Sequence, residues 1–503
     1  MRTRIGAAVT TLALAATIPL AAGAAAQDDG VTLTLLHNND GESSLATIGY
    51  GQGEDGPTLE VGGAAAFKTV TEREIADART QGNSVVNVYA GDSFLASALL
   101  ACSAPEDNDS DAPVYDALAQ SQLPYDVHVF GNHEFDHGPD FLQRFIAGFG
   151  DDMSLTQPFI SSNLDFAAEA GFADWIDEDG IIEGAPEDGR VIGSSVIVAD
   201  AETGESFGVV GATTERLPII SSPRDVAVSE AVPVIQDQID ALTAAGVDKI
   251  IFVSHLQGIE ADEGVIAQLS GVDIAVAGGG DELLANDDSQ RLPGERAETF
   301  GAYPVYATAA DGAEVPIVTT AGQYKYLGRL DATFDADGVL TGVVAEASYP
   351  RRVIPLEQEE AGLIEALEIT DAVESDPDII SSVLEPLGDC VAELKATPVA
   401  ISDVVLNVGR GQFSLEDGVF APGVRTSQTN GGTIIADSFT ASYDAYAGNV
   451  GLEPRGADNL VVTLQNGGGI RQNAGDVLPE GGGAGDAITR HNTIDVLPFL
   501  NYV

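Results

Sequence analysis

The stretch DVHVFGNHEFD, residues 126–136, runs from a β-rich segment directly into a group of polar side chains. Residues 126–130 are typical of a short buried strand. His133 and Asp136 are three positions apart, and on one helical turn this spacing lets a carboxylate fix the orientation and tautomer of an imidazole. An imidazolium held in this way can stabilise charge or protonate a leaving oxygen. The stretch therefore predicts a reaction centre at the end of a strand.

The same arrangement recurs in the first two thirds of the chain. Further β-rich runs occupy 31–36, 85–89, 194–198, 207–210, 249–253, 272–276 and 326–334, with helical stretches between several of them, such as 64–79 and 232–244. Strands that alternate with helices predict a layered α/β domain. Polar residues follow four of the strands, at 37–42, 91–92, 131–136 and 254–255. Because ligands collect beyond the carboxyl ends of strands in such sheets, we expect one site there.

Donor types suited to divalent metals are concentrated at these strand ends. The candidates are Asp40, Glu42, Asp92, Asn132, His255 and Asp281. Two metals about 3.5–4 Å apart can hold a phosphoryl group and lower the pKa of a water. Such a pair needs a carboxylate that bridges both ions, and Asp92 is placed to do this. Because Asp and Asn also favour turns and caps, ordinary turn chemistry is the competing interpretation.

Seven blocks resemble a known family in its own order. LLHNND (35–40), AGDSF (90–94), GNHEFD (131–136) and SHLQG (254–258) resemble the metal-binding blocks of the calcineurin-like metallophosphoesterases, and GNHEFD is similar to the signature of the 5'-nucleotidase branch. RTSQTNGGTIIADSF (425–439), NGGGIR (466–471) and IDVLPFLN (494–501) resemble the nucleotide-binding domain of that branch. The resemblance implies a four-layer αββα sandwich followed by a second, smaller α/β C-terminal domain.

The resemblance also implies roles for individual residues. Asp40 and Asp92 would be metal ligands, with Asp92 bridging, and Asn132 and His255 would hold the second metal. His133, paired with Asp136, would stabilise the transition state. In the second domain, the residues that match substrate-binding positions are Arg425, Asn430 and Arg471, together with Phe499 as the aromatic that stacks on the base.

Two blocks depart from the family pattern. Glu42 stands where the Asp-x-His of the first block has its histidine, and Gly279 and Asp281 replace the ligands of a late Gly-His-x-His or Gly-His-x-Gln block. Gly279 has no side chain that could bind a metal. The competing interpretation of Glu42 and Asp281 is that they are ordinary solvated carboxylates. Oxygen-rich sites suit Mn, Ca or Mg, whereas imidazole-rich sites suit Zn. We therefore expect two divalent ions in a centre that prefers Mn, Ca or Mg to Zn.

The charge balance excludes several classes of partner. The 503 residues include 79 acidic and 22 basic side chains, a net charge of −57. Such a surface repels nucleic acid polymers and anionic membranes, so the expected partner is a small nucleotide. The sequence says nothing about oligomeric state.

The N-terminus has the pattern of an export signal. Arg2 and Arg4 precede an apolar run at 5–20, and the small residues 24–26 follow. The run is shorter than a membrane span requires, which favours a cleaved signal over 1–26 and a periplasmic or extracellular location. Export permits a disulfide between the only cysteines, Cys102 and Cys390, but the sequence leaves that bridge open.

The domain prediction follows from these patterns. A catalytic domain is expected over 27–350, a helical linker over 351–396 and a nucleotide-binding domain over 397–503. Within the linker, 357–374 and 377–395 are expected to be helical. Because family members usually continue beyond the last block, we expect either a fragment or a shortened C-terminal domain.

The predicted function is metal-dependent hydrolysis of nucleotide phosphate esters, of the 5'-nucleotidase type. One alternative keeps the scaffold and changes the substrate, as in 2',3'-cyclic nucleotide phosphodiesterases or nucleotide-sugar hydrolases. Another is a catalytically impaired surface protein that binds cations or nucleotides, which Glu42 and Gly279 motivate. His133 and Asp136 argue against it, because a binding module needs no such pair.

Overall fold

The computed structural model describes residues 30–498 apart from 53–55, 108–109, 151–154, 178–179, 187–188, 296–297, 415–418, 472–475, 480–482 and 484. The expected signal segment and Phe499 lie outside the described residues. Within the described part, no helix combines the length and the apolar character needed to cross a bilayer.

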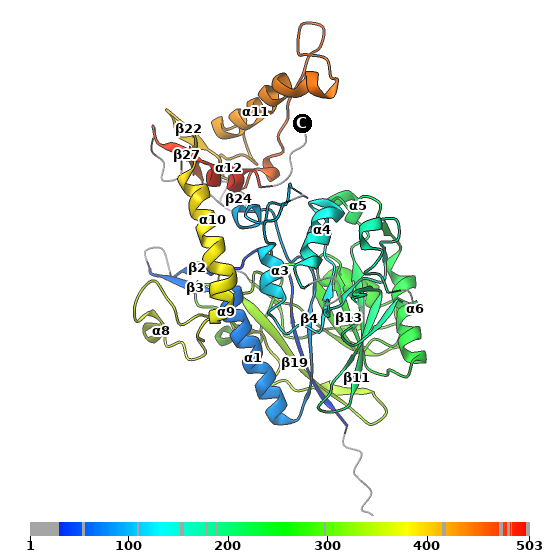
Figure 1. Ribbon diagram of the computed structural model, residues 1–503. Coiled ribbons are helices and arrows are strands. Elements are labelled where there is room, and N and C mark those ends of the chain that lie inside the picture. Colours follow the sequence, from blue (N-terminus) through cyan, green and yellow to red (C-terminus); the bar gives the residue numbers. More distant parts are fainter. Residues whose placement is uncertain are drawn as a thin grey trace, which may run out of the picture.

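Two large sheets face each other in the described part of the chain (Figure 1). The first has the order β20 (Leu340–Val343), β19 (Tyr326–Phe334), β1 (Thr32–Asn38), β4 (Ser84–Tyr89), β5 (Val127–Val129), β6 (Phe159–Ile160) and β9 (Ile192–Gly193), with β21 (Arg351–Arg352) beside β19. The second has the order β17 (Val305–Thr308), β18 (Glu314–Val318), β14 (Ile274–Gly278), β13 (Ile250–His255), β11 (Ser206–Thr213), β10 (Ser195–Ala199) and β8 (Ile181–Glu183).

Helices cover the outer faces of both sheets. On the first sheet these include α1 (Ala64–Gln81), α3 (Tyr115–Gln120) and α4 (Gly138–Ala147), and on the second α6 (Ala231–Ala244) and α7 (Ile259–Ile266). Alternation along β1 shows how the layers separate, because Leu35 belongs to the core between the sheets and Leu36 to the core under α1. The expected four-layer αββα sandwich is confirmed.

Strand direction brings the site together. β1, β4 and β5 are parallel neighbours in the first sheet, and β11, β13 and β14 are parallel neighbours in the second. Their carboxyl ends therefore meet at one edge of the sandwich. The residues that follow these strands are the candidate ligands, as the sequence predicted.

Smaller strand pairs and short helices complete this part of the chain. The pairs are β2 (Ile48–Gly51) with β3 (Thr58–Val61), β7 (Leu164–Asp165) with β12 (Ala227–Val228), and β15 (Leu283–Leu284) with β16 (Thr299–Gly301). The short helices are α2 (Ala98–Ala101), α5 (Leu217–Ile220) and the single turns η1 (His133–Phe135), η2 (Ala170–Phe172) and η3 (Asp288–Gln290).

The linker is mainly helical in its second half. The expected helix over 357–374 is wrong, since only α8 (Leu363–Ala366) forms there. Leu363 and Ile369 are instead buried in an apolar cluster with Leu59 and Val61, and this burial outweighs local helix propensity. The expected helix over 377–395 forms as α9 (Pro377–Ile379), the π-helical turn η4 (Ile380–Leu384) and α10 (Glu385–Ala396).

The C-terminal elements lie above the edge that carries the candidate ligands (Figure 1). They comprise β22 (Pro398–Ile401) with β27 (Ala487–Thr489), β23 (Leu406–Asn407) with β26 (Val477–Leu478), β24 (Gln412–Ser414) with β25 (Val419–Ala421), and the helices α11 (Asn430–Tyr446) and α12 (Arg490–Val496). Leu406, Ile435, Ile470 and Leu478 belong to a separate small core. A smaller α/β unit is therefore present after α10.

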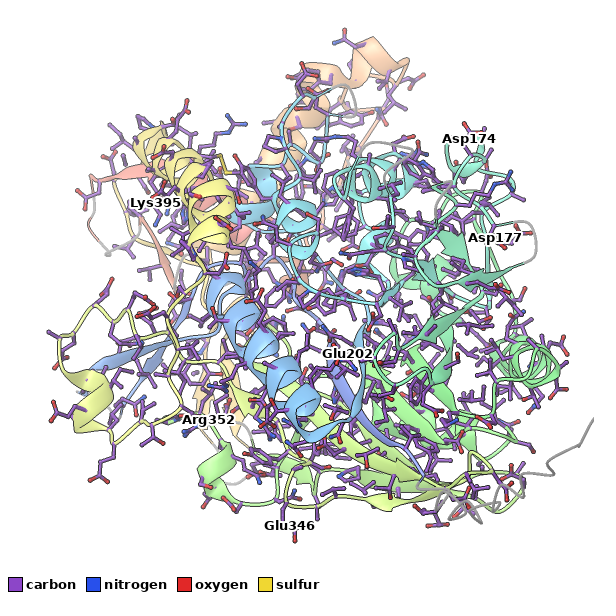
Figure 2. The ribbon with its side chains drawn as sticks, turned by 60° about the horizontal axis from the view of Figure 1, so that its bottom comes forward. Asp174, Asp177, Glu202, Glu346, Arg352 and Lys395 are labelled. Atoms are coloured by element: carbon purple, nitrogen blue, oxygen red, sulfur yellow. A yellow bond between two sulfur atoms is a disulfide. The ribbon has the colours of Figure 1, made fainter. Side chains whose placement is uncertain are left out.

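The acidic side chains are distributed over the periphery. Asp174 and Glu346 are exposed and lie at the edge of the molecule in Figure 2, and Glu202 is also exposed. Arg329, by contrast, is buried and forms ion pairs with Glu74 and Asp331. Part of the scarce positive charge is thus used to hold the fold together.

A disulfide joins the helix α10 to the segment that follows α2. Cys102 follows α2 and Cys390 lies in α10, and the structure forms the bridge that the sequence left open. Because the bridge closes a loop of 288 residues, it removes much conformational freedom from the unfolded chain.

We expect the double variant Cys102→Ser/Cys390→Ser to lower the free energy of unfolding by about 2–5 kcal/mol. Urea unfolding with and without a reductant measures this. The reductant should destabilise the parent protein and leave the variant unchanged. Equal stability of variant and parent would show that the bridge contributes nothing.

Candidate metal and catalytic site

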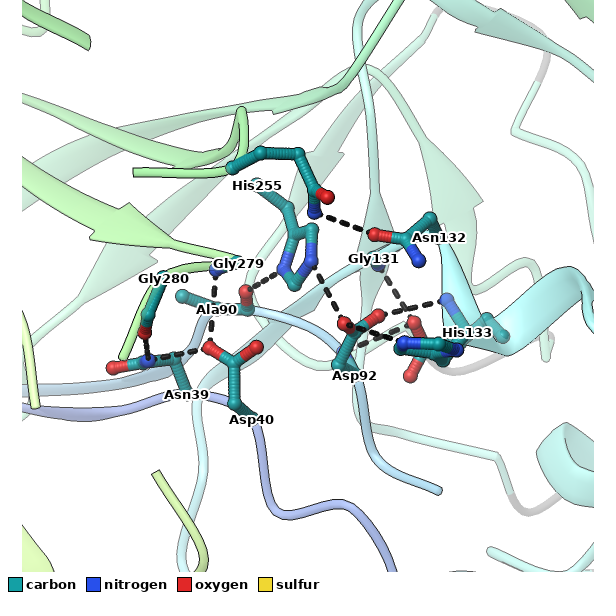
Figure 3. Close-up of polar contacts among 12 residues, drawn as sticks. Asn39, Asp40, Ala90, Asp92, Gly131, Asn132, His133, His255, Gly279 and Gly280 are labelled. Carbon is teal, nitrogen blue, oxygen red and sulfur yellow. Dashed lines mark hydrogen bonds and ion pairs between the residues drawn. The ribbon is translucent and has the colours of Figure 1, made fainter. Parts of the chain in front are cut away.

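Three buried donors lie together at the carboxyl edge of the two sheets. Asp40, Asp92 and His255 each offer one ligand atom, and these atoms lie within 4.8 Å of one another (Figure 3). They follow or end β1, β4 and β13. Asp40 and Asp92 adopt left-handed backbone conformations with φ of 51° and 59°. For residues other than glycine these cost about 1–3 kcal/mol each and are typical of functional sites.

Ionisation of all the carboxylates of this cluster together is unfavourable in the absence of a cation. Burial raises the pKa of Asp40 to about 8, and the nearby Asp92 carboxylate also raises it. Burial, with the charge of Asp92, raises the pKa of Glu42 to about 7. Among the described residues, no lysine or arginine forms an ion pair with these three carboxylates. A divalent cation would supply the missing charge.

The hydrogen bonding of His255 fits a metal ligand. Its Nδ1 donates to the carbonyl oxygen of Ala90 at 2.7 Å, which leaves Nε2 to face Asp92 Oδ2 at 3.0 Å. Burial disfavours the charged ring, but Asp92 outweighs this and raises the pKa of His255 to about 10. Two acceptor atoms this close need a proton or a cation between them. The donor set therefore fits a divalent ion.

His133 and Asp136 form the predicted pair. His133 Nδ1 lies 2.6 Å from Asp136 Oδ2, and Ser221 donates its hydroxyl to Asp136 Oδ1 at 2.8 Å. The backbone N–H of His133 donates to Asp92 Oδ1 at 2.8 Å, so the ring lies beside the carboxylate cluster. Burial opposes a charge on the ring, but Asp92 and Asp136 raise the pKa of His133 to about 10. Both carboxylates therefore favour the protonated imidazole in the metal-free protein.

The other predicted ligands lie around this centre. Asn132 is buried and lies beside His255 and Asp92 in Figure 3. Glu42 is an electrostatic neighbour of Asp92, His133 and Asp281. Asp281 is exposed. Of the predicted set, Asp40, Asp92 and His255 form the close group of carboxylate and imidazole ligand atoms found among the described residues, and the role of each predicted residue as a ligand stays a prediction.

Glu134 is a residue of the site that the sequence-based prediction missed. Its carboxylate is buried and accepts hydrogen bonds from the backbone N–H groups of Asp92, Ser93 and Gly131 at 3.0, 2.6 and 2.7 Å. It therefore holds the loops after β4 and β5 in one arrangement. Its place between His133 and Phe135 in the GNHEFD block was the available signal.

Two further residues were also missed. Asn39 donates to the carbonyl oxygen of Thr320 and accepts from its N–H, both at 3.0 Å, and it also donates to Asp40. This ties the first ligand to the loop after β18. Lys325 is an electrostatic neighbour of Glu42 and Asp281, and burial lowers its pKa against their opposing charge.

Gly131 explains why glycine opens the GNHEFD block. A Cβ atom at this position would lie 2.2 Å from Asp92 Oδ1 and 2.5 Å from the Asp92 nitrogen. Any side chain would therefore displace the central carboxylate.

The predicted substrate residues of the C-terminal unit divide into two groups. The guanidinium of Arg425 lies near those of Arg410 and Arg471, and desolvation and these two charges lower its pKa. Arg410 was not predicted. Asn430 instead uses its side chain locally, because it accepts from the N–H of Asn407 and donates to the carbonyl oxygen of Val405, both at 2.8 Å.

Three histidines outside this centre behave as structural residues. His37 is fully buried with Nε2 2.7 Å from the hydroxyl of Tyr303, and His128 Nε2 lies 2.7 Å from Gln157 Oε1. His137 is buried against Phe141.

Two sequence relatives of this chain bear the name 5'-nucleotidase or probable 5'-nucleotidase. No family model matches the chain. A mouse 5'-nucleotidase is 30% identical over 342 residues, which cover 65% of this chain and 50% of the relative, so the chain spans half the length of that protein. A probable 5'-nucleotidase of Treponema pallidum is 26% identical over 493 residues, which cover 93% of this chain and 72% of the relative.

Solved structures with the same fold agree with these relatives. The 5'-nucleotidase precursor from Thermus thermophilus matches with a TM-score of 0.63 and 24% identity, over 93% of this chain and 74% of that one. The NAD nucleotidase of Haemophilus influenzae matches with a TM-score of 0.56 and 19% identity, over 74% of this chain and 70% of that one.

Addition of Mn²⁺ to metal-free protein should raise its Tm, because the ion relieves repulsion among Asp40, Asp92 and Glu42. At one hundred times the Kd, the stabilisation should be about 2.7 kcal/mol. Calorimetry with and without chelator measures this. Asp92→Ala is the control and should abolish the rise. Absence of a rise with Mn²⁺, Mg²⁺, Ca²⁺ and Zn²⁺ would contradict a metal site.

The variant Glu134→Gln should lower the free energy of unfolding by about 1–3 kcal/mol, because its amide NH₂ cannot accept from the backbone N–H groups. It should also weaken metal binding. Urea unfolding and metal titration are the measurements. Glu263→Gln, an exposed change on α7, is the matched control and should have no effect. Equal results for the two variants would refute a positioning role for Glu134.

Proposed function

We propose that this chain, a member of the 5'-nucleotidase family, is a metal-dependent hydrolase that removes phosphate from nucleotides. The observation that carries the proposal is the buried group of Asp40, Asp92 and His255 beside the His133–Asp136 pair. A binding protein needs the first group but gains nothing from the second. Its relatives bear names of nucleotide phosphoesterases, which supports this choice.

The proposed ligands divide over two ions that share Asp92. Asp40, Glu42 and Asp281 would complete one position, and Asn132 and His255 the other. Divalent ions at these positions supply electrostatic stabilisation of a phosphoryl group and activation of water. With four carboxylates, one amide and a single imidazole, the set favours Mn, Mg or Ca over Zn.

His133 has the geometry of a proton donor or charge stabiliser. Asp136 holds Nδ1, so Nε2 is the nitrogen available to the site, 3.9 Å from Asp92 Oδ2. Because Asp92 and Asp136 favour the protonated ring, Nε2–H can donate to a phosphoryl oxygen or to the leaving oxygen. Asp136 and Ser221 keep the ring in that orientation without contacting substrate.

The C-terminal unit supports a nucleotide substrate. Arg410, Arg425 and Arg471 gather positive charge in a chain whose net charge is −57, and guanidinium groups bind phosphate in a charge-assisted, bidentate manner. Phe499, outside the described residues, is proposed to stack on the base, an interaction of about 1–3 kcal/mol. The acidic surface favours small nucleotides over polymers.

A periplasmic or extracellular location is part of the proposal. The signal-like N-terminal sequence supports it. The bridge between Cys102 and Cys390 also supports it, because disulfides persist in oxidising compartments.

His133→Ala should reduce kcat on the preferred substrate by about 10²–10⁴-fold, because it removes the positioned proton donor. Asp136→Asn should reduce kcat less, since the ring stays but loses its orientation. Metal content and Tm should stay near those of the parent for both. The substrates to assay are AMP, UDP-glucose, a 2',3'-cyclic nucleotide and p-nitrophenyl phosphate, each with Mn²⁺, Mg²⁺, Ca²⁺ and Zn²⁺.

The outcomes of this panel separate the competing functions. Preference for AMP supports a 5'-nucleotidase, whereas preference for UDP-glucose or the cyclic nucleotide supports a related phosphoesterase. Failure of the metal-loaded parent on every substrate would refute the enzyme and favour a protein that only binds cations or nucleotides.

A further inference from the structure

We propose that Gln257 supplies the metal ligand that Gly279 lacks, with its side-chain oxygen completing the position held by Asp92, Asn132 and His255. This inference rests on the proposed metal dependence. It assigns a role to Gln257, which belongs to the SHLQG segment (254–258) but not to the predicted ligand set.

The space beside Gly279 is filled by neighbouring side chains. This residue follows β14 with a φ of 80°. A Cβ atom there would lie 2.7 Å from Gln257 Nε2 and 2.8 Å from His255 Nε2. Both distances are shorter than real Cβ contacts, so no side chain at 279 is compatible with this position of Gln257. The Gln257 amide can occupy this position only because residue 279 has no side chain.

The backbone of Gln257 is strained. Its φ is 77°, a left-handed conformation that is costly for a residue other than glycine. The residue lies between β13, which ends with His255, and α7. Strain of this kind is held in ligand clamps when the surrounding structure requires it. Here it accompanies a side chain that lies against the proposed metal ligands.

The side chain of Gln257 contacts that of Asn132. Gln257 Nε2 lies 2.6 Å from Asn132 Oδ1, the atom proposed to bind the ion. A hydrogen bond to this oxygen competes with a cation for it. The two ends of a primary amide are nearly equal in shape, so a half-turn of the amide places Oε1 where Nε2 lies. Gln257 can therefore donate to Asn132 without the ion and share the ion with it when bound.

An amide oxygen from Gln257 in place of an imidazole nitrogen makes the ligand harder and leaves the charge of the ligand unchanged. An amide oxygen is neutral, as is the imidazole that the family pattern expects at 279. Replacing nitrogen by oxygen moves a site's preference from Zn²⁺ towards Mn²⁺, Mg²⁺ or Ca²⁺. Gln257 and Gly279 together would then set ion preference at this position.

The test uses the full-length protein, stripped with chelator and titrated with Mn²⁺, with bound ions counted after equilibrium dialysis. The parent should bind two ions. Loss of an outer-shell partner alone typically weakens metal binding about 10–100-fold, so Gln257→Ala should weaken the second ion at least tenfold. Gln268→Ala, an exposed glutamine beyond α7, should change nothing.

Gln257→Glu distinguishes a ligand from a residue that only positions Asn132. Glutamate keeps an oxygen but cannot donate to Asn132 Oδ1 as a carboxylate. A ligand role predicts retention of the second ion at equal or higher affinity, whereas a positioning role predicts the same loss as Gln257→Ala.

Each outcome bears on the inference. It is overturned if Gln257→Ala binds two ions as the parent does, if Gln257→Glu loses the second ion, or if the parent binds fewer than two. If the parent binds two ions, the variants behave as expected and no substrate is hydrolysed, the proposed function fails while the ligand role stands.

Discussion

The structure depends on holding several carboxylates close together in a place with little water. Asp40 and Asp92 are buried beside Glu42, and burial is the largest influence that raises the pKa of Asp40 and Glu42. This arrangement is unfavourable for the protein alone and becomes favourable when divalent cations neutralise it. The left-handed backbone at Asp40 and Asp92 adds to the same cost. Stability is therefore given up at this edge of the sandwich for the capacity to bind metal.

The scaffold around the carboxylates is fixed by backbone contacts more than by side-chain packing. Glu134 accepts three backbone N–H groups, and Gly131 lets the loop after β5 approach Asp92 more closely than any side chain permits.

The two site histidines differ in their partners. His255 donates to a carbonyl oxygen and keeps a ring nitrogen for the cluster, whereas His133 is paired with a carboxylate that favours its protonated form. One is suited to ligation and the other to proton donation.

Much of the fold followed from local patterns. The β-rich runs at 31–36, 85–89 and 326–334 became β1, β4 and β19 with nearly the same limits, because β-branched, aromatic and other apolar residues are concentrated in them. The helix expected over 357–374 failed for a tertiary reason, since burial of Leu363 and Ile369 overrode propensity. The 17-residue helix α11 was not among the elements expected from the sequence, since its glycines at 431 and 432 lower helix propensity in its first turn.

The sequence by itself determined which donor types stand at the strand ends and that His133 and Asp136 would form a pair, because both depend on short spacings. Only the tertiary structure decided how residues more than one hundred positions apart meet. It set the tautomer of His255 through Ala90, joined Cys102 to Cys390, and placed Gln257 in the space that Gly279 leaves. These contacts depend on which strands are neighbours and in what register. A linear pattern carries no record of that register, since the same polar residues could follow strands that never adjoin.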